Sequence, residues 1–119
     1  MSSAAKAKGS GAERDVVKYL KENGFQYADR RLAGATLDKG DVSGIPGVTI
    51  EIKNHATMKL SAWVEELIVE MANDKAWTGV VWHKRKGRGR PADWYCTMPG
   101  YVWVDLLRRA LNESGKNVL

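Results

Sequence analysis

The chain has 119 residues, which suits a single domain with a single core. Hydrophobic residues make up 44% of the sequence and charged residues 28%, and no apolar run reaches the roughly 20 residues of a membrane helix. Cys96 is the only cysteine, which excludes an intrachain disulfide, and no cluster of Cys and His has zinc-site spacing. The N-terminus lacks the apolar stretch of a secretory signal, so we expect a soluble, cytoplasmic protein. The net charge of +5 favours polyanionic partners such as nucleic acids.

The first predicted element is a helix. Residues 1–9 consist mainly of Ser, Ala, Lys and Gly, and we expect them to form a flexible basic tail. Ser10 and Glu13 have the spacing of a capping box, in which the hydroxyl and the carboxylate satisfy amide groups of the first turn. The helix is therefore predicted from Ser10 to about Asn23, where Gly24 ends it.

Extended segments follow this helix. We predict a strand over residues 25–33, a loop over 34–40, an extended segment over 41–43, a turn over 44–47 and a strand over 48–53. In the last of these segments Val and Ile alternate with polar residues, which places the two kinds of side chain on opposite faces of a strand.

A second helix is predicted over residues 61–75, with Ser61 as its N-terminal cap. We expect its apolar stripe to face the core or a dimer interface. The stripe consists of Trp63, Val64, Leu67, Ile68 and Met71. The opposite face is expected to lie in solvent. It carries Glu65, Glu66, Glu70 and Asp74.

The C-terminal third of the chain predicts a hairpin and a last helix. Strands over residues 78–83 and 93–98 flank a basic loop over 83–92. Residues 101–111 are predicted as a helix, with an extended conformation of 101–104 as the alternative.

The order of these elements predicts the class of the fold. Helices and strands alternate along the chain, which is typical of an α/β protein with a central mixed β-sheet flanked by helices. We expect residues 10–112 to form this single domain and residues 113–119 to form a C-terminal tail.

Asp41, Glu51 and Lys53 are candidate catalytic residues. On a strand Glu51 and Lys53 point to the same face, about 7 Å apart, and the turn over 44–47 can bring Asp41 beside Glu51. Two carboxylates supply the oxygen ligands that Mg²⁺ prefers, while a lysine can orient or deprotonate water or offset charge on a phosphate. This combination suits phosphodiester hydrolysis. The alternative is that Glu51 and Lys53 belong to the solvent face of an amphipathic strand. Asp38 is a rival to Asp41, although we expect it to be solvated.

The loop between the last two predicted strands is a candidate for binding DNA. Its glycines let the backbone approach a groove, and its cations can contact phosphates without reading the base sequence. These cations are Lys84, Arg85, Lys86, Arg88 and Arg90. The alternative is a solvated loop that has no partner.

Two further pairs of residues are candidates for contacts with DNA. Arg30 and Arg31 can contact phosphates, or they can pair with Asp29 or with the carboxylates of the second predicted helix. Trp82 and Trp94 flank the basic loop, where they can stack on unpaired bases, with packing in the core as the alternative.

Several of these residues occur in short strings that resemble a known family. The strings are Gly11-Ala12-Glu13-Arg14, Gly24-Phe25, Arg30-Arg31, Asp41-Val42 and Glu51-Ile52-Lys53-Asn54. Together they resemble the archaeal-type Holliday junction resolvases, and small phage-encoded relatives of that family more closely still, over roughly residues 8 to 110. The sequence departs from the family at Asn54 and His55, where relatives often place a small hydroxyl residue.

The resemblance implies a PD-(D/E)XK nuclease fold, a homodimer that binds branched DNA, and dependence on Mg²⁺ or Mn²⁺. It implies that Asp41 and Glu51 bind the metal, that Lys53 assists the attacking water, and that Glu13 completes the site. We therefore expect residues 10–112 to be a structure-specific endonuclease, which would act in the host cytoplasm if the protein is phage-encoded. The alternatives are a non-catalytic nucleic-acid-binding module of the same fold and a duplex endonuclease of the Mrr or restriction type. Glu13 also has an explanation without chemistry, as the capping-box partner of Ser10.

Overall fold

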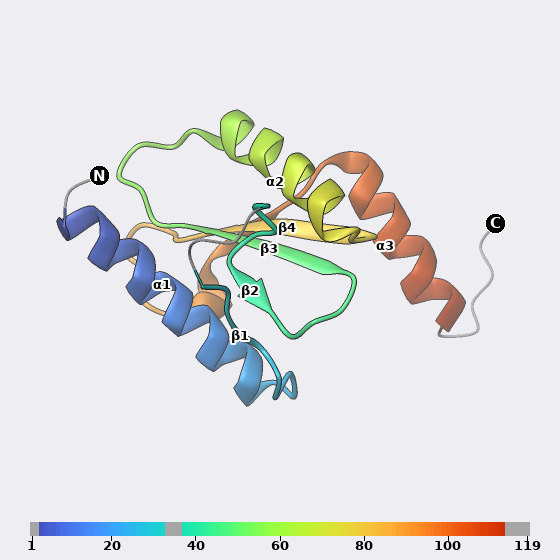
Figure 1. Ribbon diagram of the computed structural model, residues 1–119, viewed down its shortest axis with the longest axis horizontal. Helices are drawn as coiled ribbons and strands as arrows, with labels where there is room; N and C mark the ends of the chain where they lie inside the picture. Colours follow the sequence, from blue (N-terminus) through green and yellow to red (C-terminus); the bar gives the residue numbers. More distant parts are fainter. Residues whose placement is uncertain (1–2, 33–36, 114–119) are drawn as a thin grey trace.

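The computed structural model in Figure 1 describes residues 3–32 and 37–113. Its elements run in the order α1 (Ser3–Glu22), β1 (Asp29–Arg30), β2 (Val42–Ser43), β3 (Val48–Lys53), α2 (Leu60–Asp74), β4 (Thr78–His83), the 3₁₀ turn η1 (Pro91–Asp93), β5 (Tyr95–Thr97) and α3 (Gly100–Glu113). The predicted α/β class is confirmed, because the described residues form one unit in which helices pack on a small mixed sheet.

The sheet is formed by β3, β4 and β5, with β4 in the middle. Strands β3 and β4 are parallel and pair along their whole length, from Val48 opposite Thr78 to Lys53 opposite His83. Strand β5 is antiparallel to β4, so the predicted hairpin around the basic loop is confirmed. Strands β1 and β2 form a separate antiparallel pair.

Two hydrophobic clusters lie on opposite faces of the sheet. Trp82 belongs to one cluster and its neighbour Val81 on β4 to the other, and adjacent residues of a strand point to opposite faces. Figure 1 shows α1 on one side of the sheet and α2 on the other, with α3 beside one end of the sheet. The α1 cluster consists of Ala12, Val16, Val17, Leu20, Ala28, Val42, Ile50, Ile52, Trp82 and Trp94. The α2 cluster consists of Trp63, Leu67, Met71, Val81 and Val102. The stripe predicted on the second helix is therefore used largely in the chain's own core.

The first helix begins earlier than its sequence predicted. Helix α1 starts at Ser3, so the expected flexible tail over 1–9 is wrong from Ser3 onward, while residues 1–2 lie outside the described part. Ala and Lys have high helix propensity and extend the helix past the expected cap. This first part of α1 also contacts the end of the sheet, because Asn54 Nδ2 donates a hydrogen bond to the Lys8 carbonyl oxygen at 3.4 Å. Ser10 is consequently an interior residue, and the predicted capping box is wrong.

Other boundaries also differ. Within residues 25–32 the predicted strand is limited to β1, because Phe25 N donates to the Leu20 carbonyl at 3.0 Å and the chain turns after α1; residue 33 lies outside the described part. Helix α2 begins at Leu60, with Lys59 rather than Ser61 at its cap position. The last segment is helix α3, so the extended alternative for 101–104 is wrong.

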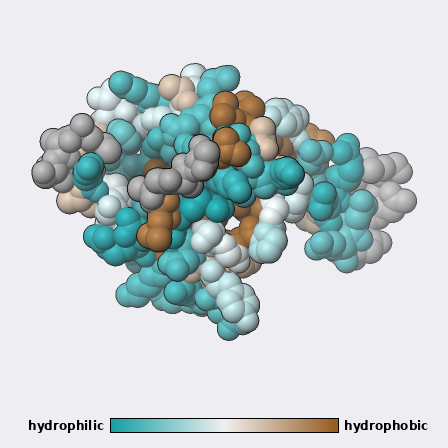
Figure 2. Space-filling model, viewed as in Figure 1, coloured by the Kyte–Doolittle hydropathy of each residue, from teal (hydrophilic) through white to brown (hydrophobic). Residues whose placement is uncertain are grey.

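The length of the helices and the character of the surface complete the description of the fold. No helix in the described ranges is long and apolar enough to cross a membrane. Figure 2 shows that the face drawn there is mostly hydrophilic, with separate hydrophobic patches. Exposed apolar side chains also occur on α3, at Tyr101, Trp103, Val104 and Leu107.

Candidate functional site

The backbone around Asp41 fixes its carboxylate beside β3. Gly40 has a φ of 90°, and a Cβ there would lie 2.9 Å from the Ile50 carbonyl oxygen, so only glycine lets the chain approach this closely. Asp41 N donates to that same carbonyl at 2.8 Å, and Asp41 Oδ2 accepts a hydrogen bond from Ile52 N at 2.7 Å. Burial raises the pKa of Asp41 from 3.8 to about 6; the Ile52 N–H opposes this rise, and the charge of Glu13 adds to it.

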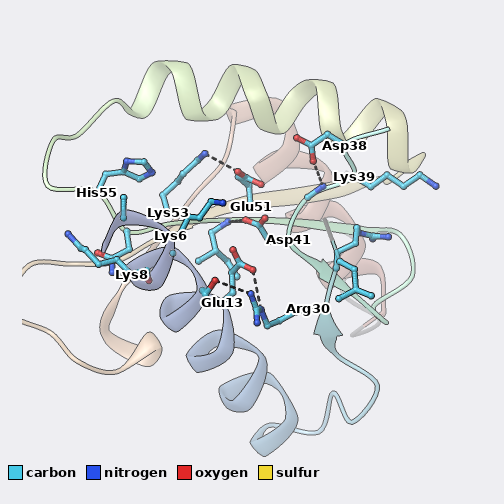
Figure 3. A pocket seen from close by; sticks show the side chains of 18 of the residues that line it. Lys6, Lys8, Glu13, Arg30, Asp38, Lys39, Asp41, Glu51, Lys53 and His55 are labelled. Atoms are coloured by element: carbon cyan, nitrogen blue, oxygen red, sulfur yellow. Dashed lines mark hydrogen bonds and ion pairs between the residues drawn. The ribbon is translucent and has the colours of Figure 1, made fainter. Parts of the chain in front are cut away.

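Glu51 and Lys53 lie on the face of β3 that is turned toward α2. Glu51 is 5% exposed and its neighbour Thr49 is fully buried, so the alternative of a solvent-facing strand is wrong. Lys53 Nζ lies 2.9 Å from Glu51 Oε2 and 2.8 Å from Glu66 Oε1. Figure 3 shows Lys53, Glu51 and Asp41 directed into one cavity.

The charges of these two residues follow from their surroundings. Burial, and then the contact with Glu66, raise the pKa of Glu51 far above its ordinary range. Burial alone would lower the pKa of Lys53, but hydrogen bonds to Glu66 and Glu51 outweigh it and raise that pKa. Lys53 is therefore an ammonium donor in this arrangement.

Glu13 lies in the middle of α1 and faces the same cavity. Its Oε1 is 3.2 Å from Arg30 Nε, and Arg30 Nη2 donates to Ser10 Oγ at 3.2 Å. Because Ser10 binds this arginine inside the helix, the capping explanation for Glu13 is wrong. Glu13 is close enough to Asp41 to raise the pKa of that carboxyl, so the structure brings the predicted acidic residues to one cavity.

A second group of acidic residues lies in this region, and one of its members was misplaced by the sequence prediction, whereas Asp38 is exposed as expected. Within the described ranges, one group of possible metal ligands has its ligand atoms all within 4.8 Å of one another: Asp38, Glu66 and Glu70. Glu70 was expected in solvent but is only 1% exposed. Burial, and then the Asp38 carboxyl, raise the pKa of Glu70 to about 8. Its burial could have been predicted, because Glu70 follows Trp63 and Leu67 by seven and three residues and so lies on the same helical stripe.

The cavity adjoins a second hollow at the basic loop, and the two share part of their lining. The acidic cavity has a volume of about 770 Å³ and the second hollow about 560 Å³. The residues that line both are Lys8, Asn54, His55 and Ala56. The second hollow is lined further by residues 84–89 of the basic loop. Figure 3 shows Lys6 and Lys8 of α1 near Lys53 and His55, so cations border the acidic centre.

The basic loop is held in place by two tryptophans. Trp94 Nε1 donates to the Arg88 carbonyl at 2.9 Å, and Trp82 Nε1 donates to the Pro91 carbonyl at 3.2 Å. Both rings are buried, at 8% exposure for Trp82 and 6% for Trp94, so the proposal that they stack on bases is wrong. Their role is to fix the backbone of the loop.

The cations of this loop differ in how they are engaged. Lys84 Nζ lies 5.5 Å from the centre of the Trp94 ring, and Arg85 lies 5.2 Å from that of Tyr95. Arg90 Nη2 is 3.5 Å from Asp93 Oδ2. Lys86 and Arg88 are exposed, and neither has an ion-pair partner among the described residues. These two cations are the freest to contact a polyanion.

Arg30 and Arg31 are engaged in different ways. Arg31 Nη2 donates to the Val42 carbonyl at 3.2 Å and lies 3.6 Å from Asp74 Oδ1, so the alternative of pairing with a carboxylate of the second helix is confirmed for it. Arg30 pairs with Glu13 at the edge of the cavity. Contact of either arginine with DNA stays a prediction.

Comparisons with protein-family models, with curated proteins and with solved structures find no match to the chain. What the site can do must therefore be inferred from its own side chains. These are buried carboxylates that can bind a cation, an ammonium group that can bind an anion, and a basic groove that leads away from them.

Proposed function

We propose that this protein is a metal-dependent endonuclease that hydrolyses phosphodiester bonds in branched DNA, with a PD-(D/E)XK nuclease fold. The observation that carries the proposal is the cavity in which Asp41, Glu51 and Lys53 meet, which shares lining residues with a second hollow at the basic loop. The motifs that resemble Holliday junction resolvases support a four-way junction as the substrate.

The residues of the cavity fit a divalent cation. Asp41 and Glu51 would hold Mg²⁺ or Mn²⁺, with Glu13 as a third carboxylate, because hard cations prefer oxygen ligands. Glu51 is buried and Asp41 is partly buried, and Lys53 is the one ammonium group that contacts Glu51 among the described residues, which supports this assignment. When bound, such an ion polarises a phosphate oxygen and lowers the pKa of water.

The protein's own residues then have separate tasks. The Ile52 N–H holds the Asp41 carboxylate in one orientation. Lys53 Nζ lies 2.9 Å from Glu51 Oε2, so Glu51 would be held in place by the lysine while it offers its carboxylate to the ion. Lys53 remains protonated, which favours stabilisation of negative charge on the phosphate over removal of a proton from water.

The groove supplies affinity for DNA. Lys8 borders the passage between the two hollows, and Lys86 and Arg88 stand free at its far end. Such cations contact phosphates and position the nucleic acid without reading bases. This favours recognition of shape over a sequence-specific duplex endonuclease, which needs groups that reach base edges.

A homodimer is part of the proposal, because two paired cuts in a junction need two active sites. The second predicted helix does not supply the interface as expected. Trp63 and Met71 are buried and Leu67 is fully buried within a single chain. The dimer therefore rests on the resemblance and on the symmetry of the substrate.

The proposal is tested by incubating the protein with a labelled four-way junction and with a linear duplex of the same arm sequence, in Mg²⁺ and in EDTA. We expect cleavage of the junction in Mg²⁺ only, and loss of cleavage in Asp41→Asn. Equal cleavage in EDTA would refute a metal-dependent mechanism. Tight junction binding without cleavage in any divalent metal would favour the non-catalytic binding module, and preferential cutting of the duplex would favour the restriction type.

A further inference from the structure

A second group of carboxylates lies next to the proposed catalytic residues. Asp38 comes from the segment before β2, while Glu66 and Glu70 lie one turn apart on α2. Their oxygen atoms are all within 4.8 Å of one another. Glu51 contacts both Glu66 and Glu70, so it lies between this triad and Asp41.

Glu70 is the unusual member of the triad. It is 1% exposed, and neither Oε1 nor Oε2 accepts a hydrogen bond from an N–H or O–H group of the described residues. The polar groups that interact with it are other carboxyls, those of Asp38, Glu51 and Glu66. A buried polar group without a partner is costly and rare in folded proteins.

Lys53 does not supply the missing hydrogen-bond partner of Glu70. Lys53 Nζ binds Glu66 at 2.8 and 3.2 Å and Glu51 at 2.9 Å, and no contact with Glu70 accompanies these bonds. The crowding of carboxyls around Glu70 can be compensated either by a shared proton or by a cation. A cation has the advantage of satisfying Asp38, Glu66 and Glu70 at once, since all three offer oxygen ligands at close range.

We propose that Asp38, Glu66 and Glu70 form a second divalent-cation site, distinct from the site of Asp41, Glu51 and Glu13. Asp38 is exposed and Glu66 is partly exposed, so the site opens to solvent on their side while Glu70 forms its buried end. An ion of the Mg²⁺ or Mn²⁺ type suits it, because all its ligands are oxygens. Binding there does not depend on nuclease activity.

The site would act on the catalytic residues through two contacts. Glu66 binds Lys53, and Glu51 lies beside both Glu66 and Glu70. A cation on the triad would compete with Lys53 for Glu66 and would place positive charge beside Glu51. The second ion would therefore leave Lys53 Nζ freer to bind a phosphate.

The test is a Mn²⁺ titration of the DNA-free protein, followed by electron paramagnetic resonance of the free ion. The wild type should bind two Mn²⁺ per chain. Glu70→Gln should weaken one site by more than about tenfold, because even residues that only support metal ligands change affinity by about 10–100-fold. Asp41→Asn should weaken the other site and leave this one. Glu65→Gln, an exposed position on the same helix, is the matched control and should bind like the wild type.

The outcomes separate this site from the proposed catalytic site. Unchanged Mn²⁺ binding in Glu70→Gln would overturn the second site and indicate a shared proton, whatever happens in Asp41→Asn. Loss of both ions in each variant would also overturn it, because the two groups would then form one site. Loss of one ion in Glu70→Gln with no effect of Asp41→Asn would support the second site while the catalytic assignment fails. If Glu70→Gln does not fold, the exposed Asp38→Asn gives the same comparison.

Discussion

The substitution Asp41→Asn should stabilise the metal-free protein while it abolishes cleavage. The pKa of Asp41 rises from 3.8 to about 6 on folding, because burial disfavours its charged form. A rise of this size corresponds to a cost on the order of 3 kcal/mol for the ionised carboxylate above pH about 6. Asparagine has nearly the same shape, carries no charge, and can still accept the hydrogen bond from Ile52 N.

The sign of the pH dependence follows from proton binding. Between the two pKa values the folded state holds the Asp41 proton more tightly than the unfolded state, so stability contributed by this group falls as the pH rises from about 4 to about 6. Below that window the carboxyl is protonated in both states, and Asp41→Asn should have little effect. Above it, the variant should be more stable than the wild type by up to about 3 kcal/mol.

The assay is urea unfolding in EDTA, followed by tryptophan fluorescence at several pH values. Asp15→Asn is the matched control, because Asp15 is exposed on α1 and its substitution should not change stability. Mg²⁺ should stabilise the wild type more than Asp41→Asn, since the variant lacks one carboxylate ligand. A variant that is less stable than the wild type near neutral pH in EDTA would refute the reasoning that a buried charge is held there at a cost.

Three other substitutions or measurements extend the test. Glu51→Gln and Lys53→Ala should each abolish cleavage at saturating junction, measured by single-turnover kinetics, without loss of junction binding, measured by electrophoretic mobility. Cleavage at the wild-type rate in either variant would contradict the assignment of the site. Replacing Arg85, Lys86 and Arg88 by Ala should weaken binding to junction and duplex alike and make the slope of log affinity against log salt shallower by about 0.9 per lost phosphate contact, with turnover retained; unchanged binding at every salt concentration would show that the loop is only solvated. Sedimentation of the protein at micromolar concentration should show a dimer, and a monomer with undiminished junction cleavage would count against it.

The parts of the fold that could be predicted are those in which one local pattern decides the structure. Strand β3 has the predicted bounds 48–53, because alternation of Val and Ile with polar residues is a strong signal. The hairpin of β4 and β5 follows from two apolar runs around a basic loop. The start of α1 could not be predicted, because Ser10 and Glu13 satisfy the capping pattern yet are occupied by Arg30, a residue far along the chain.

In the candidate site, too, some features follow from a local sequence pattern and others depend on residues far along the chain. The strand places Glu51 and Lys53 on one face as expected, but alternation alone cannot show which face is buried. Which face of β3 is buried depends on α2, whose acidic residues Glu66 and Glu70 turn toward the strand. The helical spacing of Glu70 from Trp63 and Leu67 predicts its burial, but its position beside other carboxyl groups depends on tertiary packing.

The distribution of charge links the stability of this protein to its proposed activity. The chain has an excess of positive charge, yet the cavity around Asp41, Glu51 and Glu70 concentrates carboxyl groups that must hold protons or cations to remain buried. A phosphate that approaches along the basic groove adds negative charge near these groups, which increases their affinity for cations. The reverse must hold by linkage, so a cation in the cavity increases affinity for DNA. Asp41→Asn removes the charge that requires compensation, and it should therefore bind the junction more tightly than the wild type in EDTA while losing much of the gain that a cation gives. The same carboxylates that weaken the metal-free fold thus make DNA binding and cation binding support each other.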